Sequence, residues 1–420
     1  MDGPFSSPVT GHAQTSSDTS DVDFISIDEA IDLIDWGPFQ LHLLCLIGLC
    51  TACDSMEVGL IAFIQECVKE EWGLSNNEEA LLASSILIGQ ILGMLSASIA
   101  DYFGRRPITI GGLWAVIIFG FASTFSPDYV TLLALRGLVG FGIGLSQTVS
   151  YDLCCELLPR KYRNYIMICD ILGVVAQVYL IICLFFLLSP FGWRSVLFAC
   201  AVPVLVVGVG SIWIFVESPR WLLTQGRVNE AKETLAYIAN YNGSVRSDGT
   251  LYNIEHFSLN FVKPRYGEEI DGGYTVLFSE RYIVSTIHLW IIWFCAYFTF
   301  FSVLFSLVAL QENKGKETCS YEYTGVVISG SVDVVFLLLC MVVIDWMGRP
   351  VTQSCFYGLS SAFALAWAVA AFDDPGDVLV LTTLLILSKS LYVGGMEAMW
   401  YVDEIYIYYT IPVYEHIAYS

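Results

Sequence analysis

Charged residues are scarce in this sequence, and basic ones are the scarcest. Asp, Glu, Lys and Arg make up only 14% of the 420 residues, and the acids outnumber the bases by 41 to 19. A soluble domain cannot cover a composition that is 56% hydrophobic with so little polar surface, so part of the surroundings must be lipid. The net charge of −22 argues against a nucleic-acid partner, because nucleic acids select basic surfaces.

The sequence also lacks the motifs that carry common enzyme chemistry. It has no G-x-x-x-x-G-K-[ST] phosphate loop, and no loop shows a nucleophile arranged with a base. Gly140, Gly142 and Gly144 lie inside an apolar segment with no strand before them, so they do not form a nucleotide loop. No His/Cys cluster indicates a metal site. We therefore expect a protein that is not an enzyme and that uses no cofactor.

Ten apolar segments are long enough to cross a bilayer, which takes about 20 residues as a helix. Backbone polar groups must be satisfied inside lipid, and the short alternating strands of a barrel do not appear, so we expect helices. The predicted fold class is all-α and polytopic, with spans at 40–64, 80–100, 108–126, 130–152, 166–188, 195–216, 285–310, 323–344, 351–371 and 378–400.

The basic residues predict the orientation. Of the 19 Lys and Arg residues, 13 fall in the connections that follow the even-numbered spans, and only four fall in the other connections. Basic loops remain in the cytoplasm, so we expect a cytoplasmic N-terminus. The predicted divisions are an acidic disordered tail (1–38), a six-helix bundle (39–216), a cytoplasmic loop (217–284), an incomplete four-helix bundle (285–400) and a divergent tail (401–420).

Three local features add to this plan. The segment DEAIDLID (28–35) has apolar residues at helical spacing, so it is either a short helix against the membrane or part of a frayed acidic tail. Cys67 and Cys319 both fall in predicted exterior loops and could form a disulfide, whereas the other cysteines lie mostly in apolar segments. Asn242 begins a glycosylation triplet, but its predicted place is cytoplasmic, so we expect it to be unused.

The chain spells D-x-x-G-R twice, at 101–105 and at 345–349, each time where an apolar segment ends. Each copy follows the second span of its half, which is the result that duplication of a helical unit gives. The glycines permit a tight turn, and the charges can make contacts that open and close. The copies are either conformational gates or turns that anchor the chain by their positive charge. The gate would consist of Asp101, Gly104, Arg105, Arg106, Asp345, Gly348 and Arg349.

Four motifs together resemble the major facilitator superfamily. They are ADYFGRRP (100–107) with its second copy, RGLVGFGIG (136–144), ELLPRKYR (156–163) and ESPRWLL (217–223). The segment that begins GPFQLHLL at position 37 is similar to the synaptic vesicle 2-related branch, next to the organic ion transporters. The resemblance implies two six-helix bundles that rock about a central cavity. It adds four residues to the gate: Glu156, Arg163, Glu217 and Arg220.

The C-terminal part departs from that pattern. The second half has four spans, and the match stops soon after Glu404, where the superfamily continues with a Pro- and Arg-containing box and two more helices. We therefore expect six helices followed by four, from either a truncated product or a shorter natural form. This leaves an alternative function, which is a non-transporting interaction or regulatory protein of vesicle membranes derived from a transporter.

Charged residues at bilayer depth are costly and mark candidate functional sites. Asp54 and Glu57 lie three residues apart in the first span, and two close carboxylates suit a proton or an organic cation. The alternative is a hydrated pair near the exterior end of that span. Arg136 in the fourth span either pairs with a carboxylate in the cavity or anchors at the headgroups, and Asp170 in the fifth span is its candidate partner or a cap.

The second half contributes its own candidates. Lys389 and Glu397 lie roughly on one face of the tenth span, where Lys389 corresponds to Arg136 of the first half, and Asp333 in the eighth span is a weaker candidate.

The seventh span is unusually aromatic. Trp293, Tyr297 and Phe301 recur at every fourth residue and form a stripe. The stripe either faces the cavity and holds an organic cation over its rings, or packs against lipid and neighbouring helices.

These observations favour a secondary transporter of a small organic solute or ion, by alternating access, with proton coupling as one form. The expected partners are a small-molecule substrate and the lipid bilayer. The expected location is a vesicle or the plasma membrane.

Overall fold

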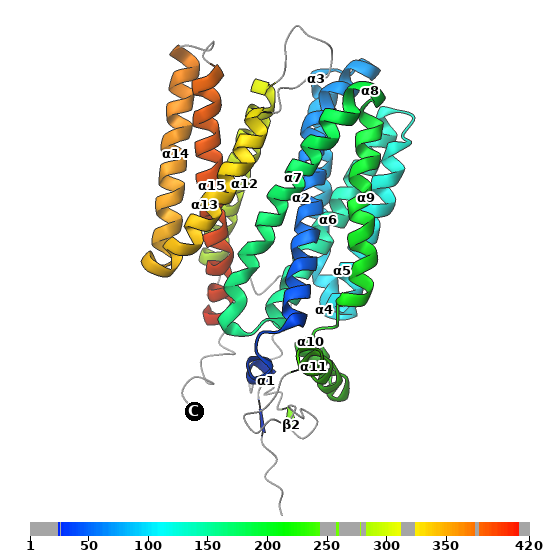
Figure 1. The fold of residues 1–420 in the computed structure, drawn as a ribbon, viewed down its shortest axis with the longest axis vertical. Coiled ribbons are helices and arrows are strands. Elements are labelled where there is room, and N and C mark those ends of the chain that lie inside the picture. Colours follow the sequence, from blue (N-terminus) through cyan, green and yellow to red (C-terminus); the bar gives the residue numbers. More distant parts are fainter. Residues whose placement is uncertain are drawn as a thin grey trace, which may run out of the picture.

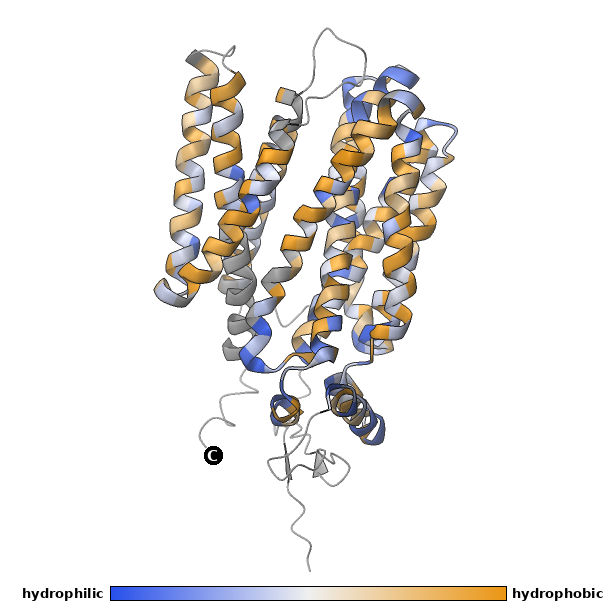
Figure 2. Cartoon of the chain, in the orientation of Figure 1, coloured by the Kyte–Doolittle hydropathy of each residue, from blue (hydrophilic) through white to orange (hydrophobic). Residues whose placement is uncertain are grey.

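The computed structural model describes residues 24–25, 27–243, 258–259, 278, 283–311, 324–373 and 378–410. In this part of the chain ten helices are long and apolar enough to cross a membrane, and each overlaps one predicted span. They stand side by side in two groups, and apolar residues run along their length (Figures 1 and 2). The predicted all-α fold with ten spans is therefore confirmed.

The N-terminal half contains α2 (Pro38–Trp72), α3 (Asn76–Ser96) with its continuation α4 (Ala100–Phe103), α5 (Arg105–Thr124), α6 (Tyr129–Leu157), α7 (Ile168–Cys183) and α9 (Trp193–Ile214). A 3₁₀ segment, η2 (Arg160–Met167), leads into α7, and a π-helical turn (Leu184–Leu188) and α8 (Ser189–Phe191) follow it. The C-terminal half contains α12 (Ile283–Gln311), α13 (Thr324–Met347), α14 (Arg349–Asp373) and α15 (Val378–Thr410).

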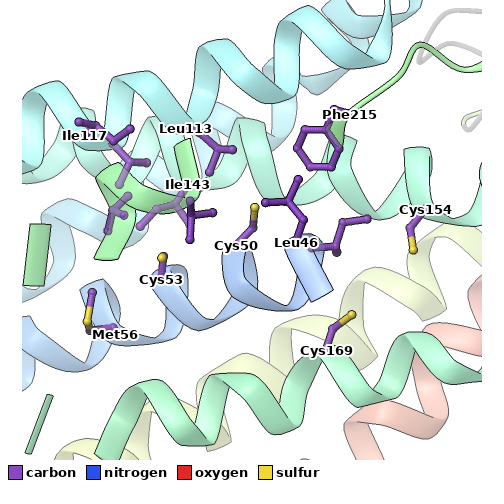
Figure 3. Packing of buried hydrophobic residues seen from close by; sticks show 14 of the residues in the cluster. Leu46, Cys50, Cys53, Met56, Leu113, Ile117, Ile143, Cys154, Cys169 and Phe215 are labelled. Atoms are coloured by element: carbon purple, nitrogen blue, oxygen red, sulfur yellow. The ribbon is translucent and has the colours of Figure 1, made fainter. Parts of the chain in front are cut away.

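Helix α2 forms the centre of the N-terminal half. Pro38 at its first position fixes the φ angle that a helix start needs, and Gly73 ends it in the left-handed conformation. Its apolar side chains are spread around the helix, and most of them are buried. Helices α7, α9, α6 and α3 pack against it. Figure 3 shows Leu46, Cys50 and Met56 within the apolar core that α2 shares with α5 and α6.

Glycines let α3 and α6 approach each other backbone to backbone. A Cβ atom added to Gly89 would collide with the carbonyl oxygen of Gly137, and one added to Gly140 would collide with that of Ile86. Small residues at helix contacts allow this approach in a membrane, where water does not drive helices together. The close contact fixes the position of α6, which carries Arg136.

The two halves meet mainly through α7 and α13. A Cβ atom added to Gly330 of α13 would lie 3.3 Å from Val174 Cγ1 of α7, so the helices are close at this point. Helix α12 also contacts α2. Within the C-terminal half, α15 packs against α14, α13 and α12. Helix α7 is therefore both a core helix of one half and the main contact with the other.

Short elements gather at one end of the bundle, which we call the α10–α11 end (Figure 1). They are α1 (Ile27–Ile34), α10 (Pro219–Thr224) and α11 (Val228–Asn242). Helix α1 has Ala30, Ile31 and Ile34 buried and packs against η2 and α11. Of the two alternatives that the sequence left for 28–35, a short helix or a frayed tail, the structure shows the helix. The strands β1 (Phe24–Ile25) and β2 (Ser258–Leu259) form a parallel pair of two residues each.

The sequence predicted a disulfide between Cys67 and Cys319 and an unused glycosylation triplet at Asn242. Cys67 is disulfide-bonded, and Cys319, its expected partner, lies outside the described residues. The side chain of Asn242 is engaged: Phe39 N–H donates to its Oδ1 at 2.9 Å, and its Nδ2 donates to Gln40 Oε1 at 2.7 Å. A glycan on Nδ2 would displace Gln40, which gives a second reason to expect that this triplet is unused.

Candidate functional site

A cavity of about 210 Å³ lies between the two halves. Helices α2, α3, α6 and α7 supply one wall, and α12, α13 and α15 supply the other. The two walls differ in chemistry. The first carries hydroxyl and amide groups, from Thr51, Ser55, Gln90, Gln147, Tyr151 and Gln177. The second is mostly aromatic and aliphatic, from Tyr297, Phe300, Phe301, Leu304, Leu307, Leu337 and Val393.

Asp54 supplies a carboxyl group to the first wall. Its side chain lines the cavity although the residue is only 5% exposed. In the part of the chain that the structure describes, its Oδ2 atom has no hydrogen-bond partner. A buried polar group without a partner costs on the order of 1–3 kcal/mol, and a charged one costs more. This geometry is therefore suited to a cationic group that enters the cavity and binds Asp54.

Glu57 and Arg136 form a buried ion pair. Arg136 Nη1 donates to Glu57 Oε2 at 2.8 Å, and the two side chains are only 1% and 2% exposed. Arg136 Nη2 also donates to Ser123 Oγ, so the pair joins α2, α5 and α6. Arg136 thus has a carboxylate partner and is not a headgroup anchor, but this pair lies behind the described cavity lining. Asp170 was the other candidate partner, and its side chain is not among those that the structure describes.

Asp333 and Lys389 form the matching pair of the C-terminal half, and both line the cavity. Lys389 Nζ donates to Asp333 Oδ2 at 2.6 Å and to Ser329 Oγ at 3.1 Å. Ser390 Oγ donates to Asp333 Oδ1 at 2.5 Å. Asp333, the weaker candidate from the sequence, is therefore the partner of Lys389. The side chain of Glu397 is not among those described.

The aromatic stripe of α12 faces the cavity in part. The Trp293 and Tyr297 ring centroids lie 5.6 Å apart at 25°, and those of Tyr297 and Phe301 lie 6.3 Å apart at 19°, so the three rings stack. Tyr297 and Phe301 line the cavity, together with Phe300. Trp293 extends the stack beyond the described lining.

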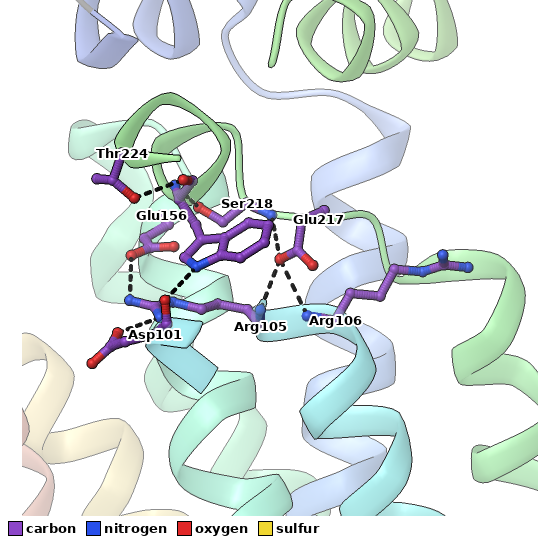
Figure 4. Close-up of polar contacts among 8 residues, drawn as sticks. Asp101, Arg105, Arg106, Glu156, Glu217, Ser218 and Thr224 are labelled. Atoms are coloured by element: carbon purple, nitrogen blue, oxygen red, sulfur yellow. Dashed lines mark hydrogen bonds and ion pairs between the residues drawn. The ribbon is translucent and has the colours of Figure 1, made fainter. Parts of the chain in front are cut away.

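The first D-x-x-G-R copy is the centre of a charge network at the α10–α11 end (Figure 4). Arg105 Nη1 donates to Asp101 Oδ1 at 2.5 Å, and its Nη2 lies 3.7 Å from Glu156 Oε1. Glu217 Oε1 accepts from the backbone N–H of Arg105 at 2.8 Å and from that of Arg106 at 3.3 Å. The network joins the α4–α5 turn to the end of α6 and to the segment after α9.

Two other gate arginines, Arg163 and Arg220, contact α1, which the sequence did not predict. Arg220 donates to Asp28, and Arg163 Nη2 lies 3.8 Å from Asp28 Oδ1. Next to them, Arg160 Nε donates to Asp32 Oδ2 at 2.7 Å, and this contact raises the pKa of the Arg160 guanidinium because Asp32 favours the charged form. The feature of the sequence that indicates these contacts is the helical spacing of the acidic residues in 28–35.

The two copies of the repeat differ in surroundings. Gly104 has φ +103° and Gly348 has φ +78°, so each occupies the region that favours glycine. A Cβ atom on Gly104 would collide with Glu217 Oε2, whereas one on Gly348 would meet nothing within 4 Å. The side chains of Asp345 and Arg349 are outside the described set, so the structure does not place the partners of the second copy.

This asymmetry predicts the effect of a matched pair of substitutions. Gly104→Ala should lower the free energy of unfolding more than Gly348→Ala, because both strain the backbone but only the first displaces Glu217 from the α5 start. We expect a difference of about 1–2 kcal/mol. Chemical unfolding of the two variants in detergent micelles measures it, and equal losses would show that Glu217 does not hold this turn.

The chain is similar to known proteins in sequence and in fold. The family model described as Major Facilitator Superfamily matches residues 47–403. The synaptic vesicle 2-related protein of Xenopus laevis is 29% identical over 408 residues, which cover 91% of this chain and 71% of that protein. The organic cation/carnitine transporter 7 of Arabidopsis thaliana is 25% identical over 91% of this chain and 82% of that protein. The xylose transporter XylE of E. coli, in a partially occluded inward-open conformation, superposes with a TM-score of 0.66 at 17% identity over 89% of each chain.

Proposed function

Since the chain belongs to the Major Facilitator Superfamily, we propose that it is a secondary transporter that carries small organic cations through the cavity between its halves by alternating access. The main support for this proposal is the position of Asp54, a buried carboxyl group that lines the cavity and whose Oδ2 has no partner in the described part of the chain. The relative named as an organic cation/carnitine transporter supports the same substrate class.

The charges of the lining favour a cation over an anion. Lys389 is paired with Asp333 at 2.6 Å, which leaves Asp54 as the carboxyl group with an unpartnered oxygen among the described lining residues. When Asp54 is ionised, a substrate with one positive charge restores neutrality at this wall of the cavity. The Tyr297 and Phe301 rings on the opposite wall attract a cation through their π faces.

The same carboxylate provides a route to proton coupling. Asp54 lines the cavity and its Oδ2 has no partner among the described residues, whereas Glu57 is paired with Arg136, so a proton can occupy Asp54 when the substrate leaves. Exchange of a proton for a cation at one carboxylate couples the two movements. The α10–α11 end, which carries the basic loops, is the cytoplasmic side in this proposal, and the membrane is that of a vesicle or the cell surface.

Uptake into proteoliposomes tests the proposed function. Radiolabelled choline and tetraethylammonium should accumulate in liposomes that contain the wild-type protein under an imposed proton gradient, and not in empty liposomes. Asp54→Asn should reduce the uptake at least tenfold, as expected from the loss of about 1.4 kcal/mol or more of binding.

Asp128→Asn is the matched control. Asp128 caps α6 at an exposed position, and Asn is an equally good cap, so uptake should be unchanged. Uptake that survives Asp54→Asn, or accumulation of uncharged solutes in place of the cations, would contradict the proposal.

A further inference from the structure

Helix α1 is held against the bundle by more contacts than a connection to α2 requires. Asp32 lies 2.6 Å from Arg160 Nη2 and also accepts from the Arg160 backbone N–H at 2.9 Å. Asp28 contacts both Arg220 of α10 and Arg163 of η2. Two acidic residues of one short helix therefore hold three arginines from two other segments.

Rings and apolar side chains reinforce these contacts. Trp36, which follows α1, has its ring centroid 5.2 Å from that of Tyr162 and 5.6 Å from that of Tyr165, and both tyrosines belong to η2. On α1 itself Ile31 is 3% exposed and Ile34 is 4% exposed. Charge complementarity with η2 and α10, and apolar packing against η2 and α11, thus both hold α1 at this end of the bundle.

The surface that α1 covers includes η2, the segment that leads into α7, and α7 is one of the helices that line the cavity. The 3₁₀ segment η2 runs directly into α7, and its eight residues are unusually many for a 3₁₀ helix, whose hydrogen-bond geometry is poorer than that of an α-helix. Further along, α7 lines the cavity with Gly173, Val174 and Gln177 and contacts α13 of the other half. A movement at η2 therefore reaches both the cavity and the contact between the halves.

We propose that α1 is a releasable strap on η2. When α1 is docked, it fixes η2 and the start of α7 against α10 and α11. When it is released, η2 can change geometry and α7 can shift against α13, which opens the cavity toward the α10–α11 end. The Asp32–Arg160 pair suits such a role because the Asp32 side chain is 32% and the Arg160 side chain 59% exposed, so this pair is weak and can dissociate. The pairs of Asp28 with Arg163 and Arg220 are more buried, with side chains 14–24% exposed.

Hydrogen exchange and thiol labelling of the full chain in lipid nanodiscs test this. In the double variant Asp28→Asn/Asp32→Asn, exchange should increase in 27–34, in 160–167 and at the start of α7, and remain unchanged in α14. A cysteine introduced at Val174, on the cavity wall, should react with a water-soluble maleimide faster by on the order of three- to tenfold, as expected when partly exposed ion pairs are lost. Peptide mass spectrometry reads the modification at this position separately from the native cysteines.

Two further variants keep the test decisive. Ile31→Asp places a charge on the buried face of α1 and should release it even if the two Asn variants leave it docked. Glu233→Gln removes one negative charge from an exposed position of α11 and should change neither readout. If α1 is released and neither η2 nor position 174 responds, α1 is a passive appendage and the proposal is wrong. It is equally wrong if no variant releases α1.

Discussion

Replacement of Arg136 by alanine is expected to lower the free energy of unfolding by about 3–5 kcal/mol. Arg136 and Glu57 are 1% and 2% exposed, so neither water nor lipid headgroups can replace the missing partner. The substitution leaves a carboxylate buried between α2, α5 and α6 and opens a cavity beside it. Chemical unfolding from detergent micelles measures the change.

Two companion variants identify the cause of that loss. Arg194→Ala removes an arginine whose ion pair with Glu71 is exposed, at 37% and 41%, and whose guanidinium lies 4.2 Å from the Trp193 ring centroid, so it should cost only about 1–2 kcal/mol. The double variant Glu57→Leu/Arg136→Met removes both charges while keeping apolar volume, and should recover most of the stability. If the double variant is as unstable as Arg136→Ala, packing and not an unpaired charge is responsible.

Replacement of Lys389 by methionine is expected to affect transport more than stability. Asp333 keeps its bond from Ser390, and the pair lines the cavity, so the loss of stability should be about 1–3 kcal/mol. The cavity then holds two uncompensated carboxylates, Asp54 and Asp333. A cation should bind more tightly and leave more slowly, so choline affinity should rise while the uptake rate falls at least tenfold.

The double variant Asp333→Asn/Lys389→Met provides the matched control. It restores a single uncompensated carboxylate in the described lining, so choline affinity should return close to that of the wild type. A lower affinity in Lys389→Met would instead mean that the lysine contacts the substrate directly, for example through a carboxylate of a zwitterion, and would contradict the assigned substrate class.

The span pattern could be predicted from the sequence because a helix in lipid must be apolar over its whole length. Segments such as 166–188 and 195–216 contain so few charges that no other assignment fits them. The ends of the helices were predicted less accurately than their number. Helix α2 extends from Pro38 to Trp72, beyond the predicted 40–64, because its polar last turns continue the helix past the apolar segment.

The partners of the buried charges could not be predicted in the same way. Glu57 and Arg136 are 79 residues apart, and the pairing depends on how α2 and α6 pack, which no local pattern records. The sequence placed both in the transport pathway, whereas the structure separates Asp54 on the cavity wall from Glu57 behind it. The docking of α1 was similarly hidden, because the sequence shows complementary charges in 28–35 and 160–163 but not that they meet.

The most direct test of the central claim compares two ligands of one shape. Choline and its uncharged carbon isostere 3,3-dimethyl-1-butanol differ in the charge that Asp54 and the α12 rings are proposed to recognise. Binding of each to the purified protein can be measured by isothermal titration calorimetry, in the wild type and in Asp54→Asn. The account predicts that choline binds the wild type at least tenfold more tightly than the isostere, and that Asp54→Asn removes the difference. Equal binding of the two compounds to the wild type would contradict it.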